Sequence, residues 1–327
     1  YDTRPTVNRM AQDRAQNIHA DEVYKEAIAR LRVGKPRRED FAATHVAPQT
    51  SGDVADEARA RVVVLAPEFA HKRGNGISAA QRVAQEILEN RGSAPRLYRN
   101  MLVFIAADLE NAEAWEKALR EYLAWKSIKD EAEPLNLDAQ QRKQVETNLK
   151  RTEETLLSRL QETYSWLIVP AQPDPTGAIE YEAHRISGQD SFYDRATRKL
   201  RQSEMLIPRW SPYNLRKELD FLWRDQDHLG LKQLWEYLAR YCYLPRLYNE
   251  EVLVQAIRDG IARDDAPFGY ATMVSLDGTY KGLVYKQPAP SRLYFDDNAV
   301  LVRPEAAEAQ LEAERRKPGN SQPLPPS

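Results

Sequence analysis

The chain has 327 residues, with 47 basic and 49 acidic side chains, and its formal net charge is −2. This length allows two domains with sizeable cores, and the charge balance supplies no global attraction to nucleic acid or to an anionic membrane. Cys242 is the only cysteine, which excludes an internal disulfide and a zinc site made of cysteines, and predicts a reducing, cytoplasmic setting. No apolar run approaches the roughly 20 residues of a membrane helix, and no signal peptide is visible.

Three short apolar runs, at residues 61–67, 101–106 and 165–171, predict strands that are buried on both faces. Residues 79–90 between the first two runs have helical periodicity, and Ser78 three residues before Gln81 forms a capping-box pattern. Residues 61–108 therefore predict a strand–helix–strand unit with parallel strands. Residues 179–186 alternate between apolar and polar side chains, which predicts an edge strand.

Residues 112–164 predict two long helices that form a hairpin. Pro134 ends the first helix, and Asp138, three residues before Gln141, caps the second. The apolar positions are sparse, which indicates packing along one narrow seam. A stripe of apolar residues before Gly34 predicts one N-terminal helix. The prediction for residues 1–190 is an α/β domain of three layers with a parallel sheet, in which the hairpin forms the last crossover.

The sequence after Pro208 predicts a second, smaller domain. Residues 213–223, 231–241 and 250–261 have helical patterns, and residues 268–285, with the turn Asp277-Gly278, predict a β-hairpin. Helices followed by a hairpin predict a winged-helix-like α+β domain over residues 191–304. Residues 305–327 predict a charged helix and then a disordered, proline-rich tail.

Two carboxylates, Asp108 and Glu68, follow predicted strands. A carboxylate at this end of a strand can bind magnesium or orient a water molecule. The alternative, which we favour, is that each residue caps the segment that follows its strand. The sequence contains no Walker A motif, no G-x-S-x-G elbow and no histidine pair at metal-ligand spacing. Asp108 and Glu68 are therefore the only catalytic candidates, and no metal site is predicted.

The basic residues suggest two further sites. An arginine fork suits phosphates and carboxylates, but it also anchors loops to carbonyl groups, and we favour the second role. The predicted reading helix of the winged domain, residues 250–261, is near neutral to acidic, so direct reading of DNA by this helix is disfavoured. The candidates for nucleotide contact are Arg4, Arg9, Arg96 and Arg99, and those for nucleic-acid contact are Arg195, Arg198, Lys199, Arg201 and Arg209.

Five blocks of the chain resemble the C-terminal part of the large ATPases labelled "domain of unknown function 499". Their order matches along the chain to about residue 304. The blocks are residues 1–9 (YDTRPTVNR), 93–108 (SAPRLYRNMLVFIAAD), 122–128 (YLAWKSI), 162–172 (ETYSWLIVPAQ) and 234–246 (LWEYLARYCYLPR). None of them is a known catalytic motif.

The resemblance implies a parent protein of about a thousand residues with a P-loop ATPase of the AAA+ kind, encoded in bacteria and archaea beside DNA methyltransferases, helicases and nucleases in phage-defence islands. The chain starts with Tyr1, not Met, and we expect it to be a piece of such a protein. The resemblance places the nucleotide-binding motifs upstream of this chain. ATP and magnesium are therefore expected for the parent, and no cofactor is expected for this piece. An arginine finger toward the parent's nucleotide is the role that Arg4, Arg9, Arg96 or Arg99 would have.

Three functions remain open. The first is a non-catalytic C-terminal region for assembly or partner contact, with the N-terminal ATPase part of the parent, a DNA methyltransferase or another defence-island protein as partner. The alternative is a nucleic-acid-binding module that uses the basic cluster at residues 195–209 and the wing. The third is a small enzyme with Asp108 and Glu68 as metal ligands, for which no third ligand or base is identifiable.

Overall fold

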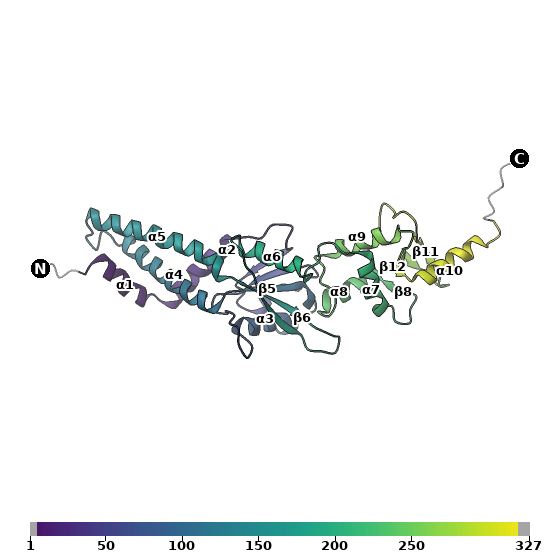
Figure 1. Ribbon diagram of the computed structural model, residues 1–327, viewed down its shortest axis with the longest axis horizontal. Coiled ribbons are helices and arrows are strands. Elements are labelled where there is room, and N and C mark those ends of the chain that lie inside the picture. Colours follow the sequence, from purple (N-terminus) through teal and green to yellow (C-terminus); the bar gives the residue numbers. More distant parts are fainter. Residues whose placement is uncertain (1–4, 320–327) are drawn as a thin grey trace. The chain divides into compact units, whose positions relative to one another are not determined.

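The computed structural model describes residues 5–319 and consists of two compact units (Figure 1). The first unit extends to Ser203, except for residues 57–59 and 98–101, which belong to the second unit together with the residues from Glu204 onward. The first unit thus continues past residue 190, where the sequence predicted the boundary, and includes the helix α6 (Phe192–Gln202), which the sequence analysis had not predicted. No helix in the described part of the chain is long and apolar enough to cross a membrane.

The first unit contains a five-stranded sheet whose strand order follows the chain order. Strands β1, β2 and β5 are parallel to one another, β6 is antiparallel to β5, and β7 is antiparallel to β6. Four of the five strands therefore share one direction, and two of the three inner strands, β2 and β5, are fully buried, as predicted. The strands are β1 (Ala43–Val46), β2 (Arg61–Val64), β5 (Leu102–Ala106), β6 (Trp166–Ala171) and β7 (Glu180–Arg185).

The predicted parallel crossover through the helical hairpin is wrong, because β6 pairs with β5 in the antiparallel sense, with Phe104 opposite Ile168. A single helix returns the chain to the end of the sheet at which the preceding strand began. A pair of antiparallel helices instead brings the chain back to the end of the sheet at which the preceding strand finished. The next strand, β6, therefore runs antiparallel to β5. The single-helix crossover from β2 through α3 (Ala79–Glu89) to β5 is parallel, as predicted.

The hairpin consists of α4 (Leu109–Asp130) and α5 (Ala139–Thr163), which pack along their length. Asp138 and Gln141 form the predicted capping box at the start of α5. The N-terminal segment forms two helices and not the single one predicted, since the chain turns at Ile18 and His19. The first of them, α1 (Val7–Asn17), packs on α4, and the core at that end comprises Val7, Ala11, Trp125, Ile128, Leu137 and Val145.

Figure 1 shows α3 on one side of the sheet, and α2 (Ala20–Val33) and α6 on the other. The Ser78–Gln81 capping box at the start of α3 is confirmed. Three short elements complete this unit, and a fourth, η2, begins the link into β5. They are η1 (Ser51–Asp53), β3 (Asn90–Arg91), β4 (Ala94–Pro95) and η2 (Arg99–Met101).

The second unit combines helices with an antiparallel sheet of order β8-β12-β9. The three predicted helices and the predicted hairpin are present, and Gly278 adopts a φ of +85° in the hairpin turn. The short strands β8 and β12 were not predicted. The elements are α7 (Pro212–Leu222), β8 (His228–Gly230), α8 (Leu231–Arg240), α9 (Glu250–Ile261), β9 (Gly269–Ala271), β10 (Met273–Val274), β11 (Tyr280–Lys281), β12 (Val300–Val302) and α10 (Pro304–Arg315).

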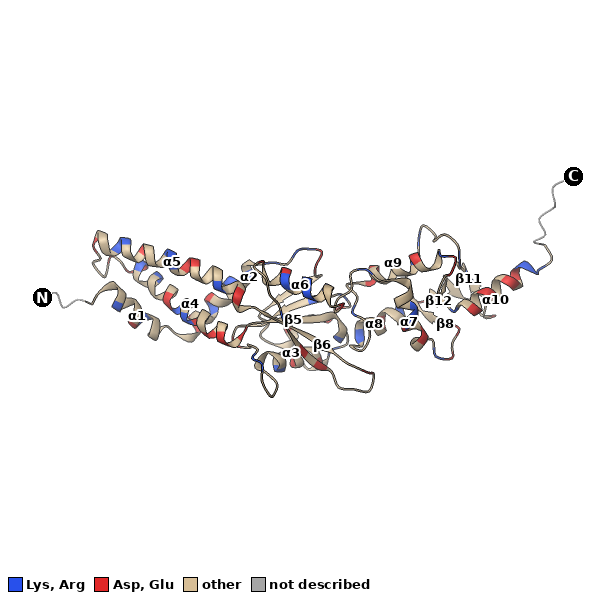
Figure 2. Cartoon of the chain, in the orientation of Figure 1, with Lys and Arg blue, Asp and Glu red and all other residues tan. Residues whose placement is uncertain are grey.

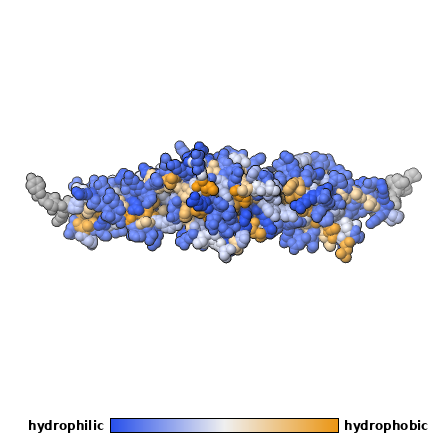
Figure 3. Space-filling view, turned by 90° about the horizontal axis from the view of Figure 1, so that it is seen from below, coloured by the Kyte–Doolittle hydropathy of each residue, from blue (hydrophilic) through white to orange (hydrophobic). Residues whose placement is uncertain are grey.

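Charges of both signs are interspersed along the helices, as α5 and α10 illustrate in Figure 2. The face drawn in Figure 3 is mostly hydrophilic, with small separate apolar patches. The predicted charged helix after residue 304 is α10, and the residues from 320 onward, where the tail was predicted, lie outside the described part of the chain.

Candidate functional site

Asp108 lies two residues after β5, at the end of the sheet where the parallel strands finish, and it is the N-cap residue of α4. Its carboxylate accepts the backbone N–H of Asn111 at 3.3 Å and the indole N–H of Trp166 at 3.0 Å. Arg185 approaches the same carboxylate to 3.6 Å and also lies over the ring of Trp166, at 4.4 Å from its centroid. The prediction that Asp108 is a helix cap is confirmed, and these contacts occupy both of its oxygens.

His71 is a buried neighbour of Asp108 that the sequence analysis did not single out. Its backbone N–H donates to the carbonyl of Ala107, and its Nδ1 lies 2.8 Å from the hydroxyl of Ser78. Its ring meets the ring of Trp166 edge-on, at 4.6 Å between centroids. Burial lowers the pKa of His71 below its ordinary 6.5, Asp108 opposes this shift, and Arg73 and Arg185 add to it. His71 lies seven residues after the end of β2, and no local signal in the sequence marked it.

The lowered pKa of His71 predicts that acid destabilises the first unit. Because the unfolded chain binds a proton near pH 6.5 and the folded chain binds it only at lower pH, stability is complete above 6.5. It then falls as the pH drops below 6.5 toward the folded pKa, by about 1.4 kcal/mol for each unit by which folding lowers the pKa. Urea titrations between pH 5 and 8 should show this loss.

The control for this prediction is His71→Asn, which keeps polar atoms near Nδ1 but does not titrate in this range. The difference in unfolding free energy between the wild type and His71→Asn should decrease as the pH falls from 7 to 5. A difference that stays constant over this range would show that His71 does not cause the acid sensitivity.

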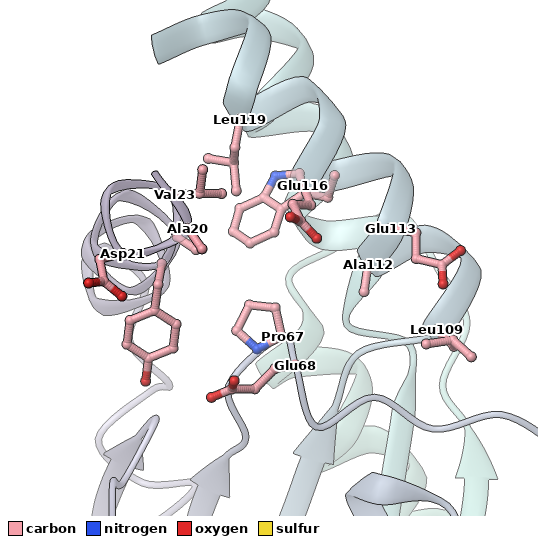
Figure 4. A pocket seen from close by; sticks show the side chains of 13 residues that line it. Ala20, Asp21, Val23, Pro67, Glu68, Leu109, Ala112, Glu113, Glu116 and Leu119 are labelled. Carbon is pink, nitrogen blue, oxygen red and sulfur yellow. The ribbon is translucent and has the colours of Figure 1, made fainter. Parts of the chain in front are cut away.

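Glu68, the second catalytic candidate, lies on the rim of a pocket of about 400 Å³ between α2 and α4 (Figure 4). The pocket is formed by the first turns of these two helices and by the Pro67–Glu68 segment after β2. No group of three histidine, cysteine or acidic side chains that could hold a metal ion occurs among residues 5–319. Glu68 therefore lies beside a pocket, and Glu68 and Asp108 do not belong to a metal site among the described residues.

Arg96 anchors loops, and its fork does not face a ligand. The side chain is 2% exposed, and its guanidinium donates to five backbone carbonyls, at distances from 2.7 to 3.3 Å. Burial lowers its pKa, and Asp56 opposes that shift. Arg96 thus has the loop-anchoring role that the sequence analysis favoured for these arginines, since its donors are satisfied inside the first unit. The acceptors are the carbonyls of Ser51, Val54, Ala55, Ile87 and Asn90.

The other three nucleotide-contact candidates have different surroundings. Arg9 is exposed on α1, and Arg99 is half-buried in η2, within the second unit. Arg4 lies outside the described residues. Within the first unit, Arg9 and Arg96 thus have different surroundings, because one is exposed on α1 and the other is buried after β4.

The predicted nucleic-acid cluster is largely occupied by internal contacts. Arg195 is buried and donates to the carbonyls of Ile186, Gln161 and Tyr164, so it cannot meet a phosphate. Arg198 pairs with Asp190, and Arg201 lies 3.1 Å from the buried Asp40.

Of the remaining members, Lys199 is half-buried on α6, and Arg209 is exposed in the second unit. The hypothesis of one basic surface is wrong for Arg195. It is weakened for Arg198 and Arg201, because each would have to leave a carboxylate before it could bind a phosphate.

In the second unit, α9 presents an acidic face to solvent. Glu250, Glu251, Gln255 and Asp259 are exposed, whereas Val252, Leu253, Ala256 and Ile257 are buried. Arg258, the basic residue of this helix, donates to the carbonyls of Pro290 and Ser291. Leu276 is fully exposed at the tip of the β10–β11 hairpin. Cys242 is buried, as predicted, and burial raises the pKa of its thiol.

Comparisons with models of protein families, with curated proteins and with solved structures find no match for this chain.

Proposed function

We propose that the chain is a non-catalytic region for assembly or partner contact, and that its second unit is a winged-helix-like module. The order of elements supports this fold: helix α7, strand β8, helices α8 and α9, and strands β9 and β12, with the β10–β11 hairpin as a wing between the last two strands. In such modules the third helix commonly meets the partner. That helix is α9 in this chain.

The acidic face of α9 is the observation that carries the proposal. A helix that reads DNA needs cations to meet the phosphates, and Glu250, Glu251 and Asp259 would repel them. Carboxylates in this position suit a basic protein surface, and the exposed Leu276 on the wing offers a separate apolar contact. We therefore propose a protein as the partner of the second unit.

The resemblance to the large ATPases supplies the identity that we propose for this partner. The parent would be a prokaryotic, cytoplasmic, ATP- and magnesium-dependent protein of anti-phage or DNA-modification systems. Its N-terminal ATPase part is the first expected partner, and a DNA methyltransferase or another defence-island protein is the second. The nucleic-acid-binding alternative is less well supported, because three of the five residues of its basic cluster, Arg195, Arg198 and Arg201, have internal partners.

The test supplies the ATPase part of a member of this family as a separate polypeptide and measures its binding to the chain by calorimetry. We expect a complex that the double variant Glu251→Lys/Asp259→Lys weakens at least tenfold. The matched control, Glu146→Lys/Glu154→Lys, reverses two exposed charges on α5 and should leave binding unchanged.

Three results would contradict the proposal. The first is the absence of a complex with the ATPase part. The second is ATP hydrolysis by the chain alone. The third is binding of labelled single-stranded or duplex DNA at 50 mM salt that weakens steeply as salt is added, which is the signature of phosphate contacts.

A further inference from the structure

The loop between β2 and α3 contains the pair Asn75-Gly76, and no other asparagine in the sequence is followed by glycine. Both residues are exposed, and residues 72–77 belong to no helix or strand. An asparagine side chain can close a five-membered ring with the backbone nitrogen of the next residue. Glycine leaves that nitrogen open to approach, because it has no Cβ atom beside it. Asn75 is therefore the asparagine best placed to react with its own backbone.

The backbone at Gly76 can move without disturbing the sheet or a helix. Its φ of +145° is one that L side chains rarely adopt, and beyond the two adjacent residues no heavy atom lies within 4 Å of the place of a Cβ atom. The N–H of Gly76 donates to the carbonyl of Gly74 at 3.1 Å, which is a bond within the loop. This bond can open without the loss of any bond of β2 or α3, so the nitrogen of Gly76 can turn toward the side chain of Asn75.

Other asparagines of the chain are held where Asn75 is not. Asn148 on α5 donates to the carbonyl of Gln144 at 3.0 Å, and the side chain of Asn249 accepts the N–H of Val252 at 3.3 Å at the start of α9. The residue that follows each of them is helical, so its nitrogen cannot turn toward the side chain while the helix is intact. The side chain of Asn75 has no hydrogen-bond partner among residues 5–319.

We propose that Asn75 is a site of spontaneous deamidation. The backbone nitrogen of Gly76 loses its proton and attacks Cγ of Asn75, so that an N–Cγ bond forms and the Cγ–Nδ2 bond breaks. The amide group leaves as ammonia with the proton that Gly76 lost, and a succinimide ring remains. Water then opens the ring. Cleavage of the new N–Cγ bond gives aspartate, and cleavage of the bond between the same nitrogen and the backbone carbonyl carbon gives isoaspartate. Water is the only co-reactant, and nothing is oxidised or reduced.

The reaction places a carboxylate where the loop had a neutral amide. Lys72 and Arg73 are the charged residues of residues 72–77, so the formal charge of the loop falls from +2 to +1. The guanidinium of Arg73 lies over the ring of Trp166, at 5.2 Å from its centroid. Isoaspartate also adds a methylene group to the backbone three residues before Ser78, the N-cap of α3. Deamidation thus makes a slow, one-way change of surface charge in the first unit, and it does not depend on the role of α9.

The test incubates the full chain at 37 °C and follows each asparagine by mass spectrometry of its peptides, with aspartate and isoaspartate separated. A synthetic peptide of residues 71–80 gives the rate for an open chain. Asn75 in the folded chain should react at no less than one tenth of the rate in the peptide, with isoaspartate as the major product. The rate should rise at least fivefold from pH 7 to pH 8.5, because the attack requires loss of the proton from Gly76.

Asn148 and Asn249 are controls within the same sample and should react at least tenfold more slowly than Asn75. Asn75→Gln would have to close a six-membered ring, so it should release ammonia at least tenfold more slowly, whereas the matched control Asn148→Gln should leave the rate at Asn75 unchanged. A rate at Asn75 below one tenth of that in the peptide, aspartate without isoaspartate, or equal conversion of Asn148 would each overturn the proposal. These three comparisons use the wild-type chain, so they remain decisive even if a variant fails to fold.

Discussion

Replacing Arg96 with alanine should lower the free energy of unfolding of the first unit by about 3–5 kcal/mol. The substitution leaves five backbone carbonyls without their donor, and several of these lie where water cannot replace it. The guanidinium joins the loop at residues 51–55 to the end of α3, so both segments should loosen together. Hydrogen exchange measured by mass spectrometry should show faster exchange in residues 47–60 and 87–97.

Two further variants show whether the geometry of the fork or its charge matters. Arg96→Lys keeps the charge but cannot reach carbonyls on both sides, so it should recover less than half of the loss. Arg91→Ala removes an exposed arginine from the neighbouring strand β3 and should change the unfolding free energy by less than about 0.5 kcal/mol. Equal stability of Arg96→Ala and Arg91→Ala would disprove the anchoring role.

Replacing Gly260 with alanine should destabilise the second unit by about 2–3 kcal/mol, although alanine is the better helix former by about 1 kcal/mol. A Cβ atom at this position of α9 would lie 2.5 Å from Cζ of Phe268 and 3.1 Å from Cβ of Pro212. Phe268 is fully buried, so its ring cannot move aside without displacing the core. Urea titration followed by hydrogen exchange in α7 and α9 measures the loss.

Gly230→Ala is the matched control in the same unit. Its nearest contact would be Cβ of Gln233 at 3.6 Å, an ordinary van der Waals distance, so only the small cost of alanine at the N-cap of α8 is expected, less than about 1 kcal/mol. The steric cause can be isolated with Phe268→Leu, which shortens the opposing side chain. Gly260→Ala should cost less in that background than in the wild type, and an equal cost in both would exclude a clash with Phe268.

Local signals in the sequence predicted most of the elements. Ser78 with Gln81 and Asp138 with Gln141 marked helix starts because their side chains satisfy backbone groups within three residues, which is a strictly local interaction. Asp277 and Gly278 likewise predicted a hairpin through the conformation of one turn.

Features that depend on distant partners were not predicted from local signals. The direction of β6 depends on how many helices separate it from β5, and the three-residue strands β8 and β12 exist only because they pair with each other and with β9. In the sequence, Arg195 is part of a run of basic residues that indicated a basic surface. Its three carbonyl partners lie in residues 161–186, outside α6, so the sequence of α6 alone does not show that Arg195 is buried.

The candidate site was predictable only in part. Asp108 and Glu68 were found because they follow strands, and the structure places one as a cap and the other on a pocket rim. The pocket itself required Val23 and Trp115 to meet, although they lie more than ninety residues apart in the sequence. Each of these apolar residues, considered alone, indicated only a buried helix face.

The antiparallel pairing of β5 with β6 has a consequence for how the hairpin can vary in length. The two strands are neighbours that a short turn could join, so the register of the sheet does not depend on how far α4 and α5 extend. Insertions or deletions of whole helical turns at matching heights in both helices should therefore leave the pairing of β5 with β6 unchanged. The length of the hairpin can thus change without a change in the strands. The residues at its tip, where Leu137 packs with α1, can also be substituted while β5 and β6 keep their pairing.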